Sequence, residues 1–167
     1  MTDDMSDDMS DDKTDDMTDD EVRDSSIDWV AEHTRQYVDT GGVEGHLWFG
    51  PRGELEVGVP CLVLTTTGRR SGKLRRNALI YIEDGDDYVI VASYGGRPSH
   101  PLWYQNLVDD PSAKIQVGAE TLDVTARTMS PEEKAVFWPQ VVEVYAPYAD
   151  YQAKTDRDIP VVRLTPT

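Results

Sequence analysis

The sequence predicts an α+β fold, mainly β, in which a six-stranded antiparallel barrel is flanked by three or four helices. Six short runs are rich in apolar and β-branched residues, as strands are. Tight-turn signals join most of these runs, and strands connected in this way pair antiparallel. The sequence has no G-x-G-x-x-G after a strand and no strand–helix alternation, which argues against a parallel dinucleotide-binding sheet.

The first helix is expected over residues 25–40, where apolar side chains recur at helical spacing and Gly41-Gly42 ends the run. A glycine-rich loop, 41–58, follows, and its Trp48 and Phe49 are candidates to fold over the domain. The six strands are expected at about 59–67, 76–83, 88–94, 113–117, 120–128 and 160–164.

The remaining helices lie in the second half of the chain. Pro101 suits the first turn of a helix that stops before Pro111. Ser130-Pro131-Glu132-Glu133 combines a cap, a proline and acids, and so predicts a helix start. Pro147 should break that helix, and a short helix is expected over 149–156.

The length of 167 residues indicates one domain, which we place at 25–167 after an acidic tail, 1–24. Residues 1–20 repeat a four-residue unit with ten Asp and one Lys, a net charge of −9. Their mutual repulsion and the lack of a large apolar face predict a disordered tail. Its simplest roles are solubility and charge, and Met17 is a candidate later start.

Charge and composition exclude several classes of function. The formal net charge is −16, and the 147 residues after the tail still carry −7, which disfavours nucleic acid as a partner. Cys61 is the only cysteine and lies in an apolar strand, where it is expected to be a buried hydrophobe. Three scattered histidines predict no metal site. The acidic N-terminus and the short apolar runs predict a soluble cytoplasmic protein without membrane insertion.

One basic segment stands out in this acidic chain. Between two strands, residues 69–76 hold five cations and no acid: Arg69, Arg70, Lys73, Arg75 and Arg76. The neighbouring glycines, Gly68 and Gly72, let backbone N–H groups approach a ligand. The segment therefore predicts an anion site, and the alternative is a solvated hairpin tip.

Three segments, LTTTGRRSGKLRRNAL, VASYGG followed by HPLWYQNL, and YAPYADYQAKTDRDIPVV, resemble the deazaflavin (F420)-dependent nitroreductase family. The resemblance runs from about Trp29 to the C-terminus. It implies a split β-barrel of the flavin-binding pyridoxine-phosphate-oxidase-like kind. It also implies an F420H2-dependent oxidoreductase that transfers a hydride from reduced F420 to a small, apolar, electron-poor acceptor such as a quinone, enone or nitroaromatic.

The same resemblance implies the site residues. Tyr148, Ser93 and Tyr145 are the catalytic candidates, with Tyr148 near the substrate. The expected cofactor-binding residues form four groups: Arg69, Arg70 and Ser71; Arg75, Arg76, Asn77, Ala78, Leu79 and Ile80; Val91, Ala92, Ser93 and Tyr94; and Leu102, Trp103, Tyr104, Gln105, Asn106 and Tyr148. Two positions depart from the family pattern, because Ala78 stands where proline is common and Tyr94 where lysine is common. The family's cofactor is anionic, with a phosphate and a tail of several glutamates, so the missing lysine charge is expected to weaken binding of that cofactor tail or to shift it to Arg97.

Other readings of these residues stay open. Tyr145, Tyr148 and Tyr151 have the spacing of helix packing, Ser93 could be a satisfied strand hydroxyl, and Trp103 could belong to the core. An FMN-dependent oxidoreductase on the same barrel, or a non-catalytic cofactor-binding module, are the alternative functions. The sequence leaves both monomer and homodimer open.

Overall fold

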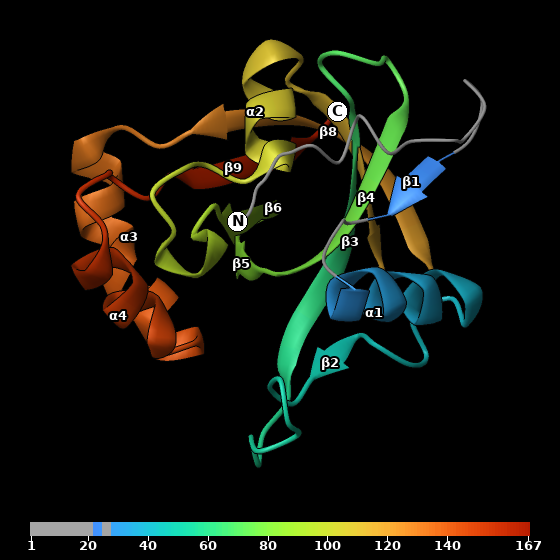
Figure 1. Cartoon of the computed structure of the whole chain (residues 1–167), viewed down its shortest axis with the longest axis horizontal. Coiled ribbons are helices and arrows are strands. Elements are labelled where there is room, and N and C mark those ends of the chain that lie inside the picture. The colour runs from blue at the N-terminus through green and yellow to red at the C-terminus, as the bar shows by residue number, and fades with distance from the viewer. Residues whose placement is uncertain (1–21, 25–27) are drawn as a thin grey trace.

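The structure is a computed structural model that describes residues 22–24 and 28–167. Most of the predicted tail, 1–24, lies outside the described residues, and so does the expected start of the first helix. Within the described residues, one curled sheet is surrounded by four α-helices (Figure 1).

The sheet contains all six predicted strands, which confirms the predicted fold class. Its main segments are β3 (Val59–Thr67), β4 (Leu74–Ile80), β5 (Ile82–Asp84), β6 (Asp87–Val91), β7 (Ser112–Val117), β8 (Glu120–Thr128) and β9 (Val161–Pro166). The strand order is β4-β3-β7-β8-β9-β6-β5, and every neighbouring pair is antiparallel. Because β4 and β5 are consecutive in the chain but lie at opposite ends of this order, the sheet curls into a split barrel.

Three details of the strands differ from the sequence prediction. The second predicted strand is divided at Tyr81 into β4, which pairs with β3, and β5, which pairs with β6, so the chain changes its partner strand at this residue. The third ends at Val91 rather than at Tyr94, because Tyr94 takes a positive φ of 48°. Two short strands were not predicted: β1 (Val22–Asp24) pairs parallel with β4, and β2 (Leu47–Trp48) pairs with β3.

The helices follow their predicted caps and breaks. They are α1 (Asp28–Asp39), α2 (Leu102–Asp109), α3 (Pro131–Val144) and α4 (Pro147–Lys154). At the start of α3, the Ser130 hydroxyl accepts a hydrogen bond from the Glu133 N–H, and the Glu133 carboxylate accepts one from the Ser130 N–H, which completes a capping box. Pro147 separates α3 from α4 as expected, but it forms the first turn of α4 instead of preceding it.

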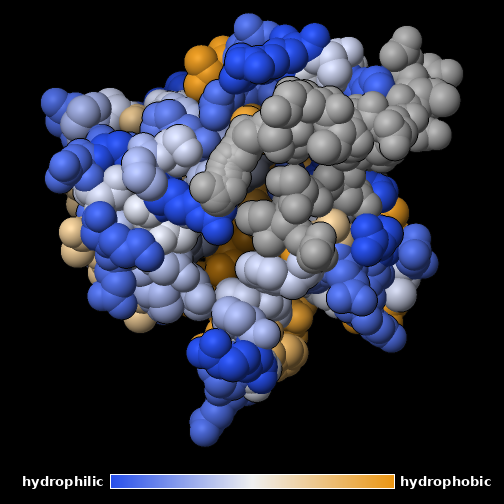
Figure 2. Space-filling model, in the orientation of Figure 1, coloured by the Kyte–Doolittle hydropathy of each residue, from blue (hydrophilic) through white to orange (hydrophobic). Residues whose placement is uncertain are grey.

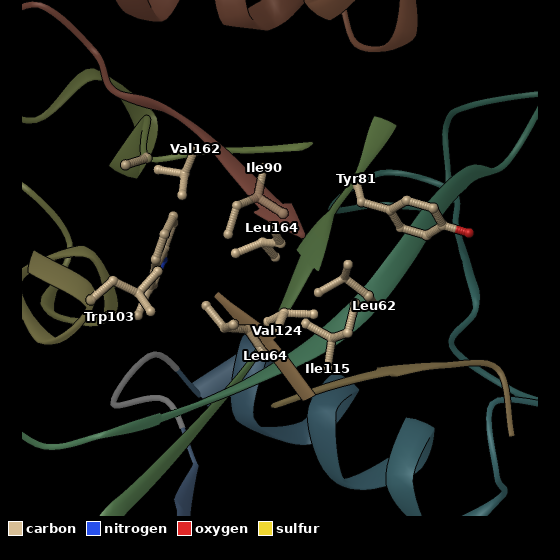
Figure 3. Close-up of a cluster of buried hydrophobic side chains, with 11 residues drawn as sticks. Leu62, Leu64, Tyr81, Ile90, Trp103, Ile115, Val124, Val162 and Leu164 are labelled. Atoms are coloured by element: carbon tan, nitrogen blue, oxygen red, sulfur yellow. The ribbon is translucent and has the colours of Figure 1, made fainter. Parts of the chain in front are cut away.

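The apolar side chains form one core inside the barrel and two clusters outside it. The inner cluster joins the strands to α2 through Trp103, Leu62 and Ile90 (Figure 3). Outside, α1 covers β3 through Tyr37, while α3 and α4 cover β5, β6 and β9 through Phe137 and Tyr148. Full burial of such side chains contributes roughly 1.5–3 kcal/mol each.

The two outer clusters meet over β4. Ile80 packs against both of them, so it lies between the α1 cluster and the α3–α4 cluster. In Figure 1, α3 and α4 lie to one side of β3 and α1 lies to the other. Figure 2 shows a hollow with hydrophobic residues on its floor between these two sides. The fold thus leaves an apolar recess beside the strands that carry the predicted site.

Candidate functional site

The basic loop joins β3 to β4 and is held by α2. Inside the loop, the Gly68 N–H donates to the Lys73 carbonyl at 2.7 Å. Arg69 is fastened twice: its N–H donates to Asn106 Oδ1 at 3.1 Å, and its Nη2 donates to Gln105 Oε1 at 2.8 Å. Asn106 is itself buried. Two predicted residues of α2 therefore orient the first cation of the loop.

The cations of this loop differ in exposure. Arg69 and Arg70 are exposed, whereas Arg75 is buried and its Nη2 donates to Ser71 Oγ at 2.9 Å. The Ser71 hydroxyl also accepts from the Lys73 N–H at 3.1 Å. Ser71 and Arg75 therefore shape the loop, while Arg69 and Arg70 present their charge to solvent, where an anionic ligand can reach them.

The predicted cofactor residues of β4 do not all point to one side. Cross-strand partners share a face, so Asn77 and Leu79 lie with Leu64 and Leu62 on the core side. Ala78 and Ile80 lie on the opposite face, against the outer clusters. Arg75 and Arg76 alternate in the same way. A single ligand on one face of the strand therefore cannot contact every side chain in this run.

Predicted residues of α2 are likewise divided. Trp103 is buried inside the barrel core (Figure 3), and the Tyr104 hydroxyl lies 2.9 Å from Thr128 Oγ1. Leu102 is half-buried at the start of the helix. Gln105 and Asn106 contact the basic loop. This helix contributes to the site mainly by holding Arg69, because its aromatic residues support the core.

The turn after β6 carries Ser93 in an unusual backbone. Val91 packs with the α3–α4 cluster and Ala92 with the core. Ser93 precedes Tyr94 (φ 48°), Gly95 and Gly96, which all have positive φ. The Arg97 guanidinium lies 4.5 Å from the centre of the Tyr94 ring. Non-glycine residues rarely adopt a positive φ, so this turn is held in place by its surroundings.

Three tyrosines at and after the α3–α4 junction, Tyr145, Tyr148 and Tyr151, pack against one another. The Tyr148 ring centre lies 5.3 Å from that of Tyr145 and 6.1 Å from that of Tyr151. Burial raises the pKa of Tyr148 and of Tyr145 far above the ordinary tyrosine value, and a hydrogen bond with Tyr151 adds to the effect at Tyr145. Tyrosines are protonated at neutral pH even without such a shift, so both phenols can act as hydrogen-bond donors.

Two hydroxyls in this region are buried and have no hydrogen-bond partner in the part of the chain that the structure describes. Tyr148 is 5% exposed and Ser93 is 9% exposed. Within residues 22–24 and 28–167, no hydrogen bond engages the hydroxyl of either side chain. A buried polar group left unpaired costs roughly 1–3 kcal/mol, so native proteins pair such groups or reserve them for a ligand. These two catalytic candidates have the hydrogen-bonding capacity that a bound ligand would use.

The structure adds residues that the sequence analysis missed. Trp48 of β2 lies 5.6 Å from Tyr145 and stacks on Trp29 at 5.7 Å between ring centres. A groove of about 520 Å³ adjoins these tryptophans and is also lined by Leu47 and Phe49. The glycine-rich loop thus packs Trp48 against the domain, as predicted, whereas Phe49 remains 43% exposed. No sequence signal paired them with Tyr145.

Arg157 and His100 connect the Ser93 turn to the basic loop. Arg157 donates to the carbonyls of Ala92 and Ser93 and to His100 Nδ1. The His100 carbonyl in turn accepts from Gln105, the residue that holds Arg69. Because an arginine can only donate, His100 must accept through an unprotonated Nδ1. No local pattern in the sequence indicated this chain of contacts.

The fold and the site together define a class of protein. A split barrel with an exposed pair of arginines, an apolar recess and unpaired buried hydroxyls suits an anionic cofactor with an apolar ring. Among the described residues, no group of three or more His, Cys, Asp or Glu side chains could hold a metal ion. No helix in the same part of the chain is long and apolar enough to cross a membrane. The architecture is that of a split-barrel, cofactor-dependent reductase.

Comparison with known proteins gives the family. Residues 29–166 match the family described as F420H(2)-dependent quinone reductase. The F420H(2)-dependent quinone reductase Rv1261c of Mycobacterium tuberculosis is 40% identical over 136 residues, which cover 80% of this chain and 87% of that protein. This chain therefore belongs to the F420H2-dependent quinone reductase family. The predicted family, enzyme class and cofactor are confirmed: the protein is an oxidoreductase that uses reduced F420.

Two solved structures agree with this family. A structure described as an F420-H2 dependent reductase, FDR-A, is 46% identical with a TM-score of 0.58, covering 63% of this chain and 93% of that one. A structure described as a domain-swapped dimer is 40% identical with a TM-score of 0.60, covering 84% of this chain and 99% of that one. The residues present fit the cofactor, because the exposed Arg69 and Arg70 can bind an anionic group and the hollow seen in Figure 2 has a hydrophobic floor.

Proposed function

We propose that this protein reduces a small quinone with F420H2, and that Tyr148 donates a hydrogen bond to the quinone oxygen. The observation that carries the proposal is the buried Tyr148 hydroxyl, which lacks a partner among the described residues and borders an aromatic wall. Two-electron reduction of a quinone adds a hydride and a proton. Reduced F420 supplies the hydride when it is bound.

The residues of this chain bind the cofactor, orient the acceptor and donate hydrogen bonds to it. Arg69 and Arg70 attract the anionic part of the cofactor, and Gln105 keeps Arg69 in place. Ser93 offers its free hydroxyl to the ring or to the acceptor. Tyr148, like an ordinary tyrosine, is protonated at neutral pH, and burial raises its pKa further, so its hydroxyl can donate a hydrogen bond to negative charge that develops on the acceptor oxygen. The flat faces of Tyr145 and Trp48 suit a planar apolar acceptor.

The test removes the Tyr148 hydroxyl and keeps the ring. Tyr148→Phe should lower kcat with F420H2 and menadione by about 100-fold, the loss typical of one transition-state donor. The Kd for oxidised F420, followed by tryptophan fluorescence, should stay within about threefold, since only a local hydrogen bond is lost. Tyr88→Phe, on the core-facing side of β6, is the matched control and should leave kcat unchanged. An equal loss of binding and turnover in Tyr148→Phe would make this residue structural.

We also infer that the protein forms a homodimer in solution. The support is the 40% identical structure described as a domain-swapped dimer, which matches 84% of this chain. Light scattering coupled to size-exclusion chromatography tests the inference. A mass of one chain, 18.7 kDa, at all accessible concentrations would refute it.

A further inference from the structure

We propose that Arg157 is a positioning residue that fixes the Ser93 turn against the tyrosine helix α4, and that turnover depends on this clamp. The inference deepens the proposed function and rests on it, because it concerns the two walls of the same site. Arg157 lies between α4 and β9, outside the residues assigned to binding or catalysis.

The guanidinium of Arg157 donates hydrogen bonds to three backbone carbonyls around one turn. Its Nη1 donates to the Ala92 carbonyl at 3.2 Å, its Nη2 to the Ser93 carbonyl at 2.7 Å, and its Nε to the Arg97 carbonyl at 2.8 Å. Two of these acceptors precede the 3-10 turn Tyr94–Gly96, and the third follows it directly, so the guanidinium spans the turn from one end to the other. Arginine presents five N–H groups in a rigid plane, so it can hold several carbonyls at fixed angles where lysine cannot.

The turn needs such support because its backbone is unusual. Tyr94, Gly95 and Gly96 have φ values of 48°, 64° and 80°. The turn has two internal hydrogen bonds, from the Gly96 N–H to the Ser93 carbonyl and from the Arg97 N–H to the Tyr94 carbonyl. The first of these shares its acceptor with Arg157. Loss of the guanidinium therefore releases the backbone of Ser93, whose hydroxyl is one of the two unpaired groups of the site.

Arg157 is itself fastened to α4. Gln152 donates from its Nε2 to the Arg157 carbonyl at 2.9 Å. The same Gln152 side chain accepts from Lys134 Nζ at 2.7 Å and from the Ile159 N–H at 3.0 Å. Gln152 belongs to the helix that carries Tyr148. The path from Tyr148 along α4 to Gln152, Arg157 and Ser93 is therefore continuous through backbone and hydrogen bonds.

The backbone of the turn also packs directly against the backbone of α4. A Cβ placed on Gly96 would lie 2.8 Å from the Tyr151 carbonyl oxygen, so the two backbones are in close contact. Within the part of the chain that the structure describes, the side-chain partners of Arg157 are carbonyl oxygens and an imidazole, and none is a carboxylate. This bonding pattern suits a clamp on backbone geometry rather than a surface ion pair.

The experiment uses the full chain and the variant Arg157→Ala, which leaves space for a guanidinium ion. Arg163→Ala is the matched control, since Arg163 is a half-buried arginine of β9 that bonds Asp84 and Asp87 away from the site. Hydrogen exchange is measured first, without cofactor. The Gly96 and Arg97 amides should exchange at least about tenfold faster in Arg157→Ala, because the turn opens locally. They should be unchanged in Arg163→Ala.

Turnover with F420H2 and menadione is measured next. Arg157→Ala should lower kcat by about 100-fold, the scale expected when reacting groups move by about 1 Å, with the KM for menadione within about threefold. Guanidinium chloride at tens of millimolar should restore part of the lost kcat, whereas sodium chloride at the same ionic strength should not. Arg157→Lys should remain impaired.

Each result decides one question. Unchanged exchange of the Gly96 and Arg97 amides overturns the clamp. Faster exchange with wild-type kcat, or an equal loss of kcat in Arg163→Ala, overturns the dependence of turnover on it. If the exchange result for Arg157→Ala is as expected but the wild-type protein does not oxidise F420H2 with menadione, the proposed quinone reduction is refuted. The clamp would still stand, because the exchange measurement needs no cofactor.

Discussion

Replacing Arg69 and Arg70 together by glutamine tests whether the basic loop binds the anionic part of F420. Both side chains are exposed at the tip between β3 and β4. Arg69 is oriented by Gln105 and Asn106, so little of its freedom is lost when a ligand binds. Glutamine keeps much of the side-chain length and polarity. The double variant should therefore fold normally and lose the two charges, together with the exposed hydrogen bond from Arg69 to Gln105.

The expected magnitude follows from the exposure of the two arginines. A unit charge about 4 Å from an opposite charge gains about 1 kcal/mol in water. Two such contacts give about 2 kcal/mol, which corresponds to roughly a 30-fold increase in Kd. The Debye length falls from about 10 Å at 0.1 M salt to about 3 Å at 1 M. The difference between the wild type and the variant should therefore shrink to a few-fold at high salt.

The assay is a fluorescence titration with oxidised F420 at low and high salt. The control is Lys114→Gln with Arg127→Gln, which removes two charges from side chains that are 60% and 56% exposed on β7 and β8. This control changes the net charge equally and should leave the Kd within about twofold, because those residues lie outside the basic loop. Equal weakening in both double variants would refute a local anion site and point to the overall charge instead.

Two further predictions concern stability and pH. The buried Tyr37 hydroxyl donates to the Cys61 carbonyl at 2.9 Å and accepts from the Gly118 N–H at 2.7 Å, so Tyr37→Phe should lower the free energy of unfolding in urea by about 1–3 kcal/mol; an unchanged midpoint would contradict this. Burial and the Arg157 guanidinium lower the pKa of His100 below its ordinary value, so its neutral form is favoured in the folded protein and the wild type should lose stability relative to His100→Gln as the pH falls below about 6.5. Parallel stability curves between pH 5 and 8 would show that His100 contributes no such term.

Local sequence signals predicted most of the fold, because most helices and strands begin and end at residues whose own chemistry caps or breaks them. The Ser130-Pro131-Glu132-Glu133 start became a complete capping box, and Pro147 separated two helices. The strands followed their apolar alternation. The break at Tyr81 was missed because the run on either side is equally apolar, and its cause is a change of partner strand, from β3 for β4 to β6 for β5. Such long-range contacts leave no periodic signal.

The candidate site was predictable in composition but not in arrangement. The cluster of cations from Arg69 to Arg76 marked the loop, and the resemblance indicated Ser93 and Tyr148. The sequence could not separate Arg75, which is buried against Ser71, from the exposed Arg70. It also could not show which hydroxyls lack partners. Both properties depend on packing between segments that are distant in the chain.

The Tyr148 hydroxyl, which has no partner among residues 22–24 and 28–167, links activity to stability. A buried hydroxyl without a partner destabilises the free protein by roughly 1–3 kcal/mol, and a bound ligand removes this penalty. Tyr148→Phe deletes the hydroxyl and keeps the ring contacts with Tyr145 and Tyr151. The same variant that loses turnover should therefore unfold at a higher temperature than the wild type in the absence of cofactor. A lower melting temperature would mean that the hydroxyl stabilises the free protein. In that case the site would not be prepared for a ligand in the way the structure indicates.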